Sequence, residues 1–119
     1  MVVLKLQGND GSLIWGRRVG SSSYDYGKNL IVSDLDEPII TGYTLGSWFE
    51  SQVGKGDMFV IRLDKNNGST VQGYQGFILI IWLNLINFNI EGSSYRDQNN
   101  GLASSSTGKI ITGGYTFIL

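Results

Sequence analysis

The chain carries one sequence motif twice, and this repetition limits the folds that it can adopt. Gly20–Asp25 (Gly-Ser-Ser-Ser-Tyr-Asp) returns as Gly92–Asp97 (Gly-Ser-Ser-Tyr-Arg-Asp). Downstream of each copy, Ile39–Thr44 (Ile-Ile-Thr-Gly-Tyr-Thr) returns as Ile110–Thr116 (Ile-Ile-Thr-Gly-Gly-Tyr-Thr). Repeats of this kind are short supersecondary units that complete a core only against their neighbours. The sequence therefore predicts a modular chain.

A second repeated pair sets the spacing of the units. Leu4–Ser12 parallels Ile61–Ser69, so the two copies begin 57 positions apart, whereas the Gly-Ser-Ser motifs lie 72 positions apart. We predict one unit over residues 1–56 and a second, irregular unit over residues 57–119. The extra residues form an apolar insertion at about 70–91.

Short apolar runs separated by glycine and asparagine turns predict an all-β protein. The 119 residues include 17 glycines and one proline, and apolar residues do not keep helical spacing over three turns. Within the turn 8–11, Asp10-Gly11 supplies the positive φ that a tight hairpin needs. The strands are expected at 2–6, 13–19, 29–33, 38–44, 57–63, 101–105 and 109–116, and 20–28 and 45–56 are expected to be loops.

The most apolar part of the chain, residues 77–90, lies within the insertion. A bilayer-spanning helix needs roughly 20 apolar residues, and this run is shorter and is interrupted by Asn84, Asn87 and Asn89. The pattern therefore argues against a membrane span. It favours one long buried strand, or two strands with a turn near Asn84, over a core helix.

The order of motifs resembles the SBBP-type bacterial β-propeller repeat. The residues that carry the resemblance are Phe59–Asp64, Leu13–Trp15, Gly20–Gly27, Leu30–Asp34 and Ile39–Thr44. The resemblance covers residues 2–69 and 92–116, whereas residues 70–91 depart from it. It implies two four-stranded antiparallel blade-like units, in a family of scaffolds or binding modules found commonly in exported or cell-surface proteins.

Two blades leave a propeller open, because closure typically takes about four to eight. The chain would then be an excerpt of a longer array, a subunit of a ring made from copies of itself, or a sandwich or barrel instead of a propeller.

Composition argues against most catalytic chemistry and against two classes of partner. The chain has no cysteine and no histidine, which removes thiol nucleophiles, thiolate metal sites and the commonest general base. Nine basic and ten acidic residues are scattered singly, so no field attracts nucleic acid or an anionic membrane. We therefore expect a protein that is not an enzyme and needs no cofactor.

Four residues are candidates for ligand contact. Asp25 and Asp97 occupy equivalent positions in the repeated motif, where each either contacts a ligand or holds backbone N–H groups of its own loop. Trp48 and Phe49 lie in the loop 45–56, where they either stack on a sugar or protein partner or fill the gap to the next blade.

Two further acidic stretches have oxygen atoms at alternate positions, as calcium loops do. Asp34–Glu37 and Asp64–Gly68 both lack the full twelve-residue loop with its bidentate glutamate. Hairpin turns explain them better, and we predict no metal site.

The leading hypothesis is a non-catalytic β-propeller segment that acts as a scaffold or binding module, with other blades or copies of itself as partners. The alternative is a small carbohydrate-binding protein that oligomerises to close a ring.

Overall fold

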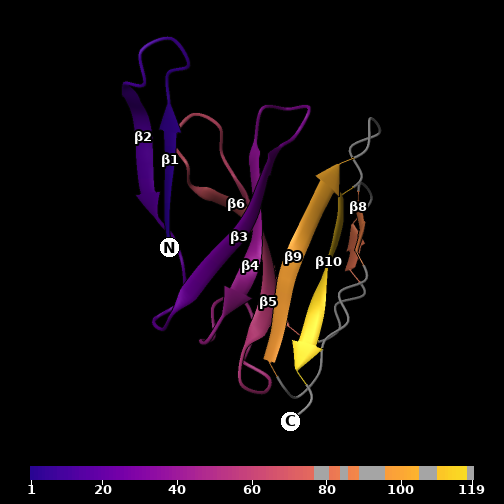
Figure 1. The fold of residues 1–119 in the computed structure, drawn as a ribbon. Helices are drawn as coiled ribbons and strands as arrows, with labels where there is room; N and C mark the ends of the chain where they lie inside the picture. The colour runs from indigo at the N-terminus through magenta and orange to yellow at the C-terminus, as the bar shows by residue number, and fades with distance from the viewer. Residues whose placement is uncertain (77–80, 84–85, 89–95, 105–109, 118–119) are drawn as a thin grey trace.

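The chain folds into β-strands. The computed structural model describes residues 1–76, 81–83, 86–88, 96–104 and 110–117, and from residue 77 onward it describes the backbone alone. The strands are β1 Val2–Leu6, β2 Leu13–Arg18, β3 Asp25–Val32, β4 Pro38–Thr44, β5 Asp57–Leu63, β6 Thr70–Gln75, β7 Ile81–Leu83, β8 Ile86–Phe88, β9 Arg96–Ser104 and β10 Ile110–Phe117 (Figure 1). None of these residues is helical, which confirms the all-β prediction.

The predicted starts of β3 and β9 are wrong by several residues, the other predicted boundaries agree to within one residue, and β6 was not predicted. Residues 25–28, expected in a loop, already pair with β4, beginning with Asp25 opposite Thr44. Strand β9 likewise begins five residues before the expected 101. The polar sequence of these segments looks like a loop, but pairing with the next strand satisfies their backbone groups.

Strand β6 occupies the first part of the predicted insertion, and the most apolar run, residues 77–90, contains two short strands. Residues 81–83 and 86–88 pair antiparallel, with Ile81 opposite Phe88. This agrees with the prediction of two strands with a turn near Asn84, although Asn84 itself lies outside the described residues.

The largest sheet joins the two predicted units. It is an antiparallel meander in the order β3-β4-β5-β6, while β1-β2, β7-β8 and β9-β10 are separate pairs. Strands β3 and β4 come from the first copy of the repeat, and β5 and β6 come from the second. The sheet is therefore offset from the sequence repeat by two strands, and it does not close on itself.

The hairpins β1-β2 and β5-β6 are structural copies. Leu4 pairs with Gly16 as Ile61 pairs with Gly73, and the register shifts after Lys5 in one hairpin and after Arg62 in the other. In the turns, the backbone N–H groups of Gly11 and Gly68 donate to the carbonyl oxygens of Gln7 and Asp64, each at 2.9 Å. Both glycines have φ near 70°, a conformation that glycine adopts readily.

The hairpins β3-β4 and β9-β10 match equally well. Asp25 opposite Thr44 corresponds to Asp97 opposite Thr116, and the register shift after Gly27 recurs after Asn99. Equivalent positions of the two hairpins lie 72 residues apart in the chain throughout. Ile39 therefore corresponds to Ile111, one position beyond the match that the sequence motif suggested.

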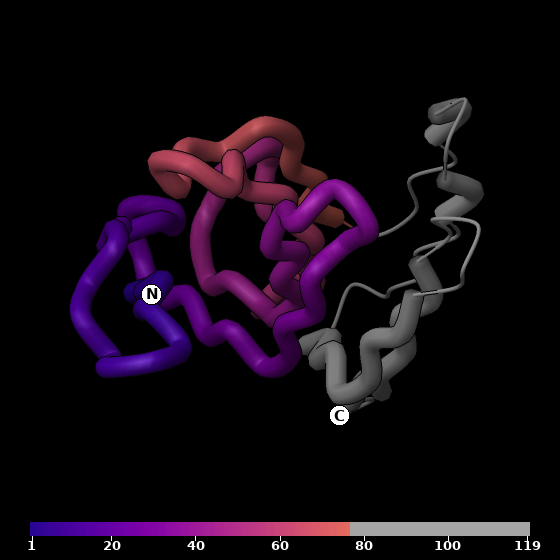
Figure 2. The backbone as a smooth tube through the Cα atoms, turned by 90° about the horizontal axis from the view of Figure 1, so that it is seen from above, coloured from indigo at the N-terminus to yellow at the C-terminus, as the bar shows by residue number. Residues whose placement is uncertain are grey.

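The core lies between the N-terminal hairpin and one face of the large sheet. Val3 and Trp15 from β1-β2 pack against an apolar set on β4 and β5, comprising Ile40, Phe59, Ile61 and Leu63. The indole Nε1 of Trp15 also donates to the Lys65 carbonyl at 2.9 Å. Figure 2 shows this hairpin beside the sheet.

The opposite face of the sheet is buried as well. Ile39, Tyr43, Met58 and Val60 are each at most 9% exposed. The backbone of β9 runs along β3, β4 and β5 on the side away from β1-β2 (Figure 1). The large sheet is thus the central layer of the molecule.

Gly73 provides a test of the packing between the core and the loop 45–56. A Cβ atom at Gly73 would overlap the Phe49 ring. We expect Gly73→Ala to lower the free energy of unfolding by about 1–3 kcal/mol, as overpacking does, measured by urea denaturation. Gly8→Ala is the control, because its Cβ would meet nothing within 4 Å. Equal stability of the two variants would contradict the packing.

Candidate functional site

Asp25 closes its own loop. Its Oδ2 accepts a hydrogen bond from the backbone N–H of Ser21 at 2.8 Å, and its Oδ1 accepts one from the Ser21 hydroxyl at 3.0 Å. The carboxylate lies where a Cβ at Gly20 would stand, and Gly20 has φ of 148°. The loop-holding interpretation of Asp25 is therefore confirmed, and ligand contact by Asp25 stays a prediction.

A polar cavity of about 290 Å³ lies beside this loop. It is lined by Met1, Arg18, Val19, Gly20, Ser21, Ser23 and Asp25. The hydrogen-bonding side chains of this lining are Arg18, Ser21, Ser23 and Asp25, and the Asp25 carboxylate keeps acceptor capacity beyond its two bonds to Ser21.

Asp97 occupies the same place in its hairpin as Asp25. The two residues share one register position, opposite Thr116 and Thr44 respectively. The side chain of Asp97 is outside the described part of the structure, so any role in binding remains a prediction.

Trp48 and Phe49 pack against the core. Their rings stack at 4.6 Å between centroids, and the Trp48 ring meets Phe59 edge-on at 5.3 Å. Both are half-buried against the same core that the N-terminal hairpin covers. This arrangement favours the gap-filling interpretation over an exposed stacking platform.

A buried polar network holds the Trp48 loop, and sequence reasoning missed it. The Nε2 of Gln75 donates to the Gly46 carbonyl at 2.7 Å and to Asp57 Oδ2 at 2.9 Å. Its Oε1 accepts the backbone N–H groups of Trp48 at 2.6 Å and of Phe49 at 3.2 Å. Asp57 in turn accepts the Val53 N–H. Gln75 and Asp57 are each 1% exposed.

The two candidate loops are connected through Thr44. Its hydroxyl donates to the Ser21 Oγ at 3.2 Å, and it accepts the Gly46 N–H at 3.1 Å. A chain of hydrogen bonds thus links the Asp25 loop to the Trp48 loop through Ser21, Thr44, Gly46 and Gln75. No sequence motif indicated Gln75, because the sequence of β6 departs from the repeat although its pairing does not.

Exposed tyrosines form a second feature that the sequence did not reveal. Tyr24 and Tyr26 are 70% and 41% exposed, and their rings stack at 6.5 Å. Tyr26 also stacks on the buried Tyr43 at 4.6 Å, and the Lys28 ammonium lies 5.6 Å from the Tyr43 ring. Tyr24 and Tyr26 are two positions apart, which is the spacing of side chains on one face of a strand. This signal was missed because residues 25–28 were expected in a loop.

The acidic stretches considered for calcium form turns. Asp64 Oδ1 accepts the backbone N–H groups of Asn66 and Asn67, and Asp36 adopts φ of 63° in the turn before β4. Within the described ranges, no three acidic side chains gather as a metal site would require.

The pKa values of Asp10 and Tyr74 are shifted from their ordinary values. The backbone N–H of Ser12 donates to Asp10, which lowers the pKa of that carboxyl. Burial raises the pKa of the Tyr74 phenol. Neither shift creates an acid–base pair in the candidate loops.

Comparison with protein-family models found no match, and comparison with curated proteins found no similar sequence. Across the part of the chain that the structure describes, no helix has the length and apolar character needed to cross a membrane.

The Gln75 network gives a direct stability test. Gln75→Leu would leave the buried Asp57 carboxylate and two backbone N–H groups short of partners, at about 1–3 kcal/mol for each unsatisfied group. In urea denaturation, we expect Gln75→Leu to lower the free energy of unfolding several-fold more than Gln7→Leu does. Gln7 is the control because it is exposed. Equal losses would show that the network does not stabilise the loop.

Asp25 can be tested in the same way. We expect Asp25→Ala to lower the free energy of unfolding by about 0.5–2 kcal/mol, as removal of other backbone-capping side chains does. Asp34→Ala, at an exposed turn position, is the control. An unchanged thermal midpoint for Asp25→Ala would argue that this carboxylate has no structural role.

Proposed function

We propose that this chain is a non-catalytic scaffold or binding module built from β-propeller-type repeats. In this proposal β3-β4-β5-β6 is one complete blade. Hairpin β1-β2 is the outer half of the preceding blade, and β9-β10 is the inner half of the following one.

The observation that supports the proposal is the pairing of β4 with β5. Six residue pairs, from Ile39 opposite Arg62 to Thr44 opposite Asp57, join the two copies of the repeat into one sheet. Each copy therefore depends on the next for its strand partners, as blades that share strands between repeats do. The flanking hairpins lie on the two faces of this sheet, as neighbouring blades would.

Native-state hydrogen exchange tests this blade assignment. If β3-β4-β5-β6 is one blade, the amides of β4 and β5 should open with one shared free energy. If the repeats of residues 1–56 and 57–119 are the folding units, β4 should instead open with β1 and β2, and separately from β5. The second result would overturn the proposal.

Carbohydrate binding remains the second candidate function, and the exposed tyrosines favour it. Tyr24, at the outer end of the stacked Tyr24, Tyr26 and Tyr43 rings, is 70% exposed, and sugars bind by stacking on aromatic rings. Trp48 and Phe49, the candidates from the sequence, are half-buried and pack against the core instead.

A glycan array probed with the purified chain tests this alternative. Specific binding that Tyr24→Ala abolishes and Leu35→Ala leaves intact would support a carbohydrate-binding protein. Leu35 is a suitable control because it is comparably exposed, at 64%. A blank array would leave the scaffold function as the better account.

A further inference from the structure

Strand β1 lacks the cover that its structural copy β5 possesses. Phe59, Ile61 and Leu63 on β5 are all 0% exposed. The equivalent positions on β1 hold Val2, Leu4 and Leu6, which are 69%, 58% and 51% exposed. The apolar pattern is the same in both strands, so β1 has the sequence of a covered strand, as β5 is, but its apolar side chains are exposed.

The backbone of β1 is also open along one side. Among the described strands, β1 pairs with β2 alone, whereas β5 pairs with β6 on one side and β4 on the other. An unpaired strand edge is a template for another strand. Because β1 is the copy of β5, and β5 pairs with β4, the missing neighbour of β1 should be a strand equivalent to β4.

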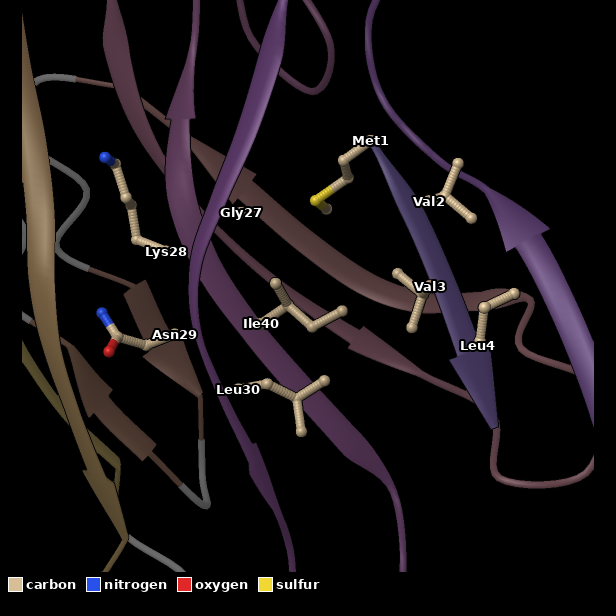
Figure 3. Close-up of a pocket in the computed structure, with 9 residues that line it drawn as sticks. All are labelled: Met1, Val2, Val3, Leu4, Gly27, Lys28, Asn29, Leu30 and Ile40. Carbon is tan, nitrogen blue, oxygen red and sulfur yellow. The ribbon is translucent and has the colours of Figure 1, made fainter. Parts of the chain in front are cut away.

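A cleft lies where that neighbour would enter. The cleft has a volume of about 330 Å³, and it lies between the open side of β1 and the strands β3 and β4. Its lining is Met1, Val2, Val3, Leu4, Gly27, Lys28, Asn29, Leu30 and Ile40. Figure 3 shows Met1, Val3, Leu30 and Ile40 around this space. Leu30 is 54% exposed, so the far wall of the cleft is uncovered as well.

The chain itself carries a strand of the required kind. Strand β10 is the structural copy of β4, with the same spacing of 72 residues and the same register against its hairpin partner. Among the described strands, β10 pairs with β9 alone, and β8 lies near β10 without pairing with it.

We propose that β10 of one copy of this chain pairs antiparallel with β1 of a second copy, entering the cleft beside β3. This proposal rests on the proposed repeat function. The pairing of β4 with β5 sets the register, in which Thr112 lies opposite Leu4 of the second copy, as Ile40 lies opposite Ile61. The result is a four-stranded sheet, β9-β10-β1-β2, shared between two copies.

The assembly is head-to-tail, because β10 and β1 are different surfaces. Such contacts generate closed rings when the rotation closes and open filaments when it does not. Backbone hydrogen bonds would supply affinity, as in other cases of strand addition, and the apolar side chains of β1 would supply register.

Disulfide trapping tests the pairing, because the chain has no cysteine of its own. We would mix Leu4→Cys with Thr112→Cys under mild oxidation. Opposed strand residues lie within the distance that a disulfide spans. The expected product is a mixed dimer on a non-reducing gel, and the double variant Leu4→Cys/Thr112→Cys should form a ladder of higher multimers.

Two controls separate this pairing from non-specific association of apolar surface. Ile111→Cys replaces Thr112→Cys in the first, because a shift of one residue places the thiols on opposite faces of the sheet. Leu30→Lys, introduced at the cleft wall, should reduce the yield of mixed dimer at least tenfold. Leu35→Lys, at an equally exposed loop position, should leave the yield unchanged.

The results also separate this inference from the proposed function. Ile40→Cys/Ile61→Cys should form a disulfide within one chain, since these residues are opposed in the central sheet. If that bond forms but Leu4→Cys and Thr112→Cys give no mixed dimer, or give only dimers of Leu4→Cys with itself, the inference is overturned and the blade assignment stands. If the internal bond also fails, both are overturned.

Discussion

The pairing of β4 with β5 is the interaction on which the rest of the structure depends. Among the residues whose side chains the structure describes, these two central strands contribute most of the buried apolar groups, and both of their faces are covered. Because the pair joins two copies of a sequence repeat, neither copy completes a sheet by itself. The flanking hairpins then stack on a surface that already exists, which is the usual logic of repeat architectures.

Polar groups buried beside this core need hydrogen-bond partners, and the loops supply them. Gln75, Asp57 and Thr44 lie inside the protein, where an unpaired polar group costs free energy. Each finds partners in the turns that follow β4, so the loop 45–56 is held by hydrogen bonds as well as by its aromatic rings. The candidate site residues Asp25, Trp48 and Phe49 thereby contribute to structure before any ligand is considered.

Local signals predicted much of the fold. Alternating apolar residues and Asp-Gly or Asn-Gly turns located β1, β4 and β5 to the residue, because hairpin turns and strand periodicity are properties of short segments. The start of β3 was missed, since its first residues are polar and glycine-rich. Their strand conformation depends on pairing with β4, which a local pattern does not contain.

The sequence by itself determined that the chain is all-β, that its units repeat, and that histidine and cysteine chemistry is absent. Only the tertiary structure decided how strands from different repeats combine into a sheet. It also decided that Trp48 and Phe49 pack inward while Tyr24 and Tyr26 face solvent. The physical reason is that repetition and periodicity are local, whereas strand partners and burial arise between residues far apart in the chain. The exposed Leu4 and the buried Ile61 occupy equivalent repeat positions, and only their neighbours distinguish them.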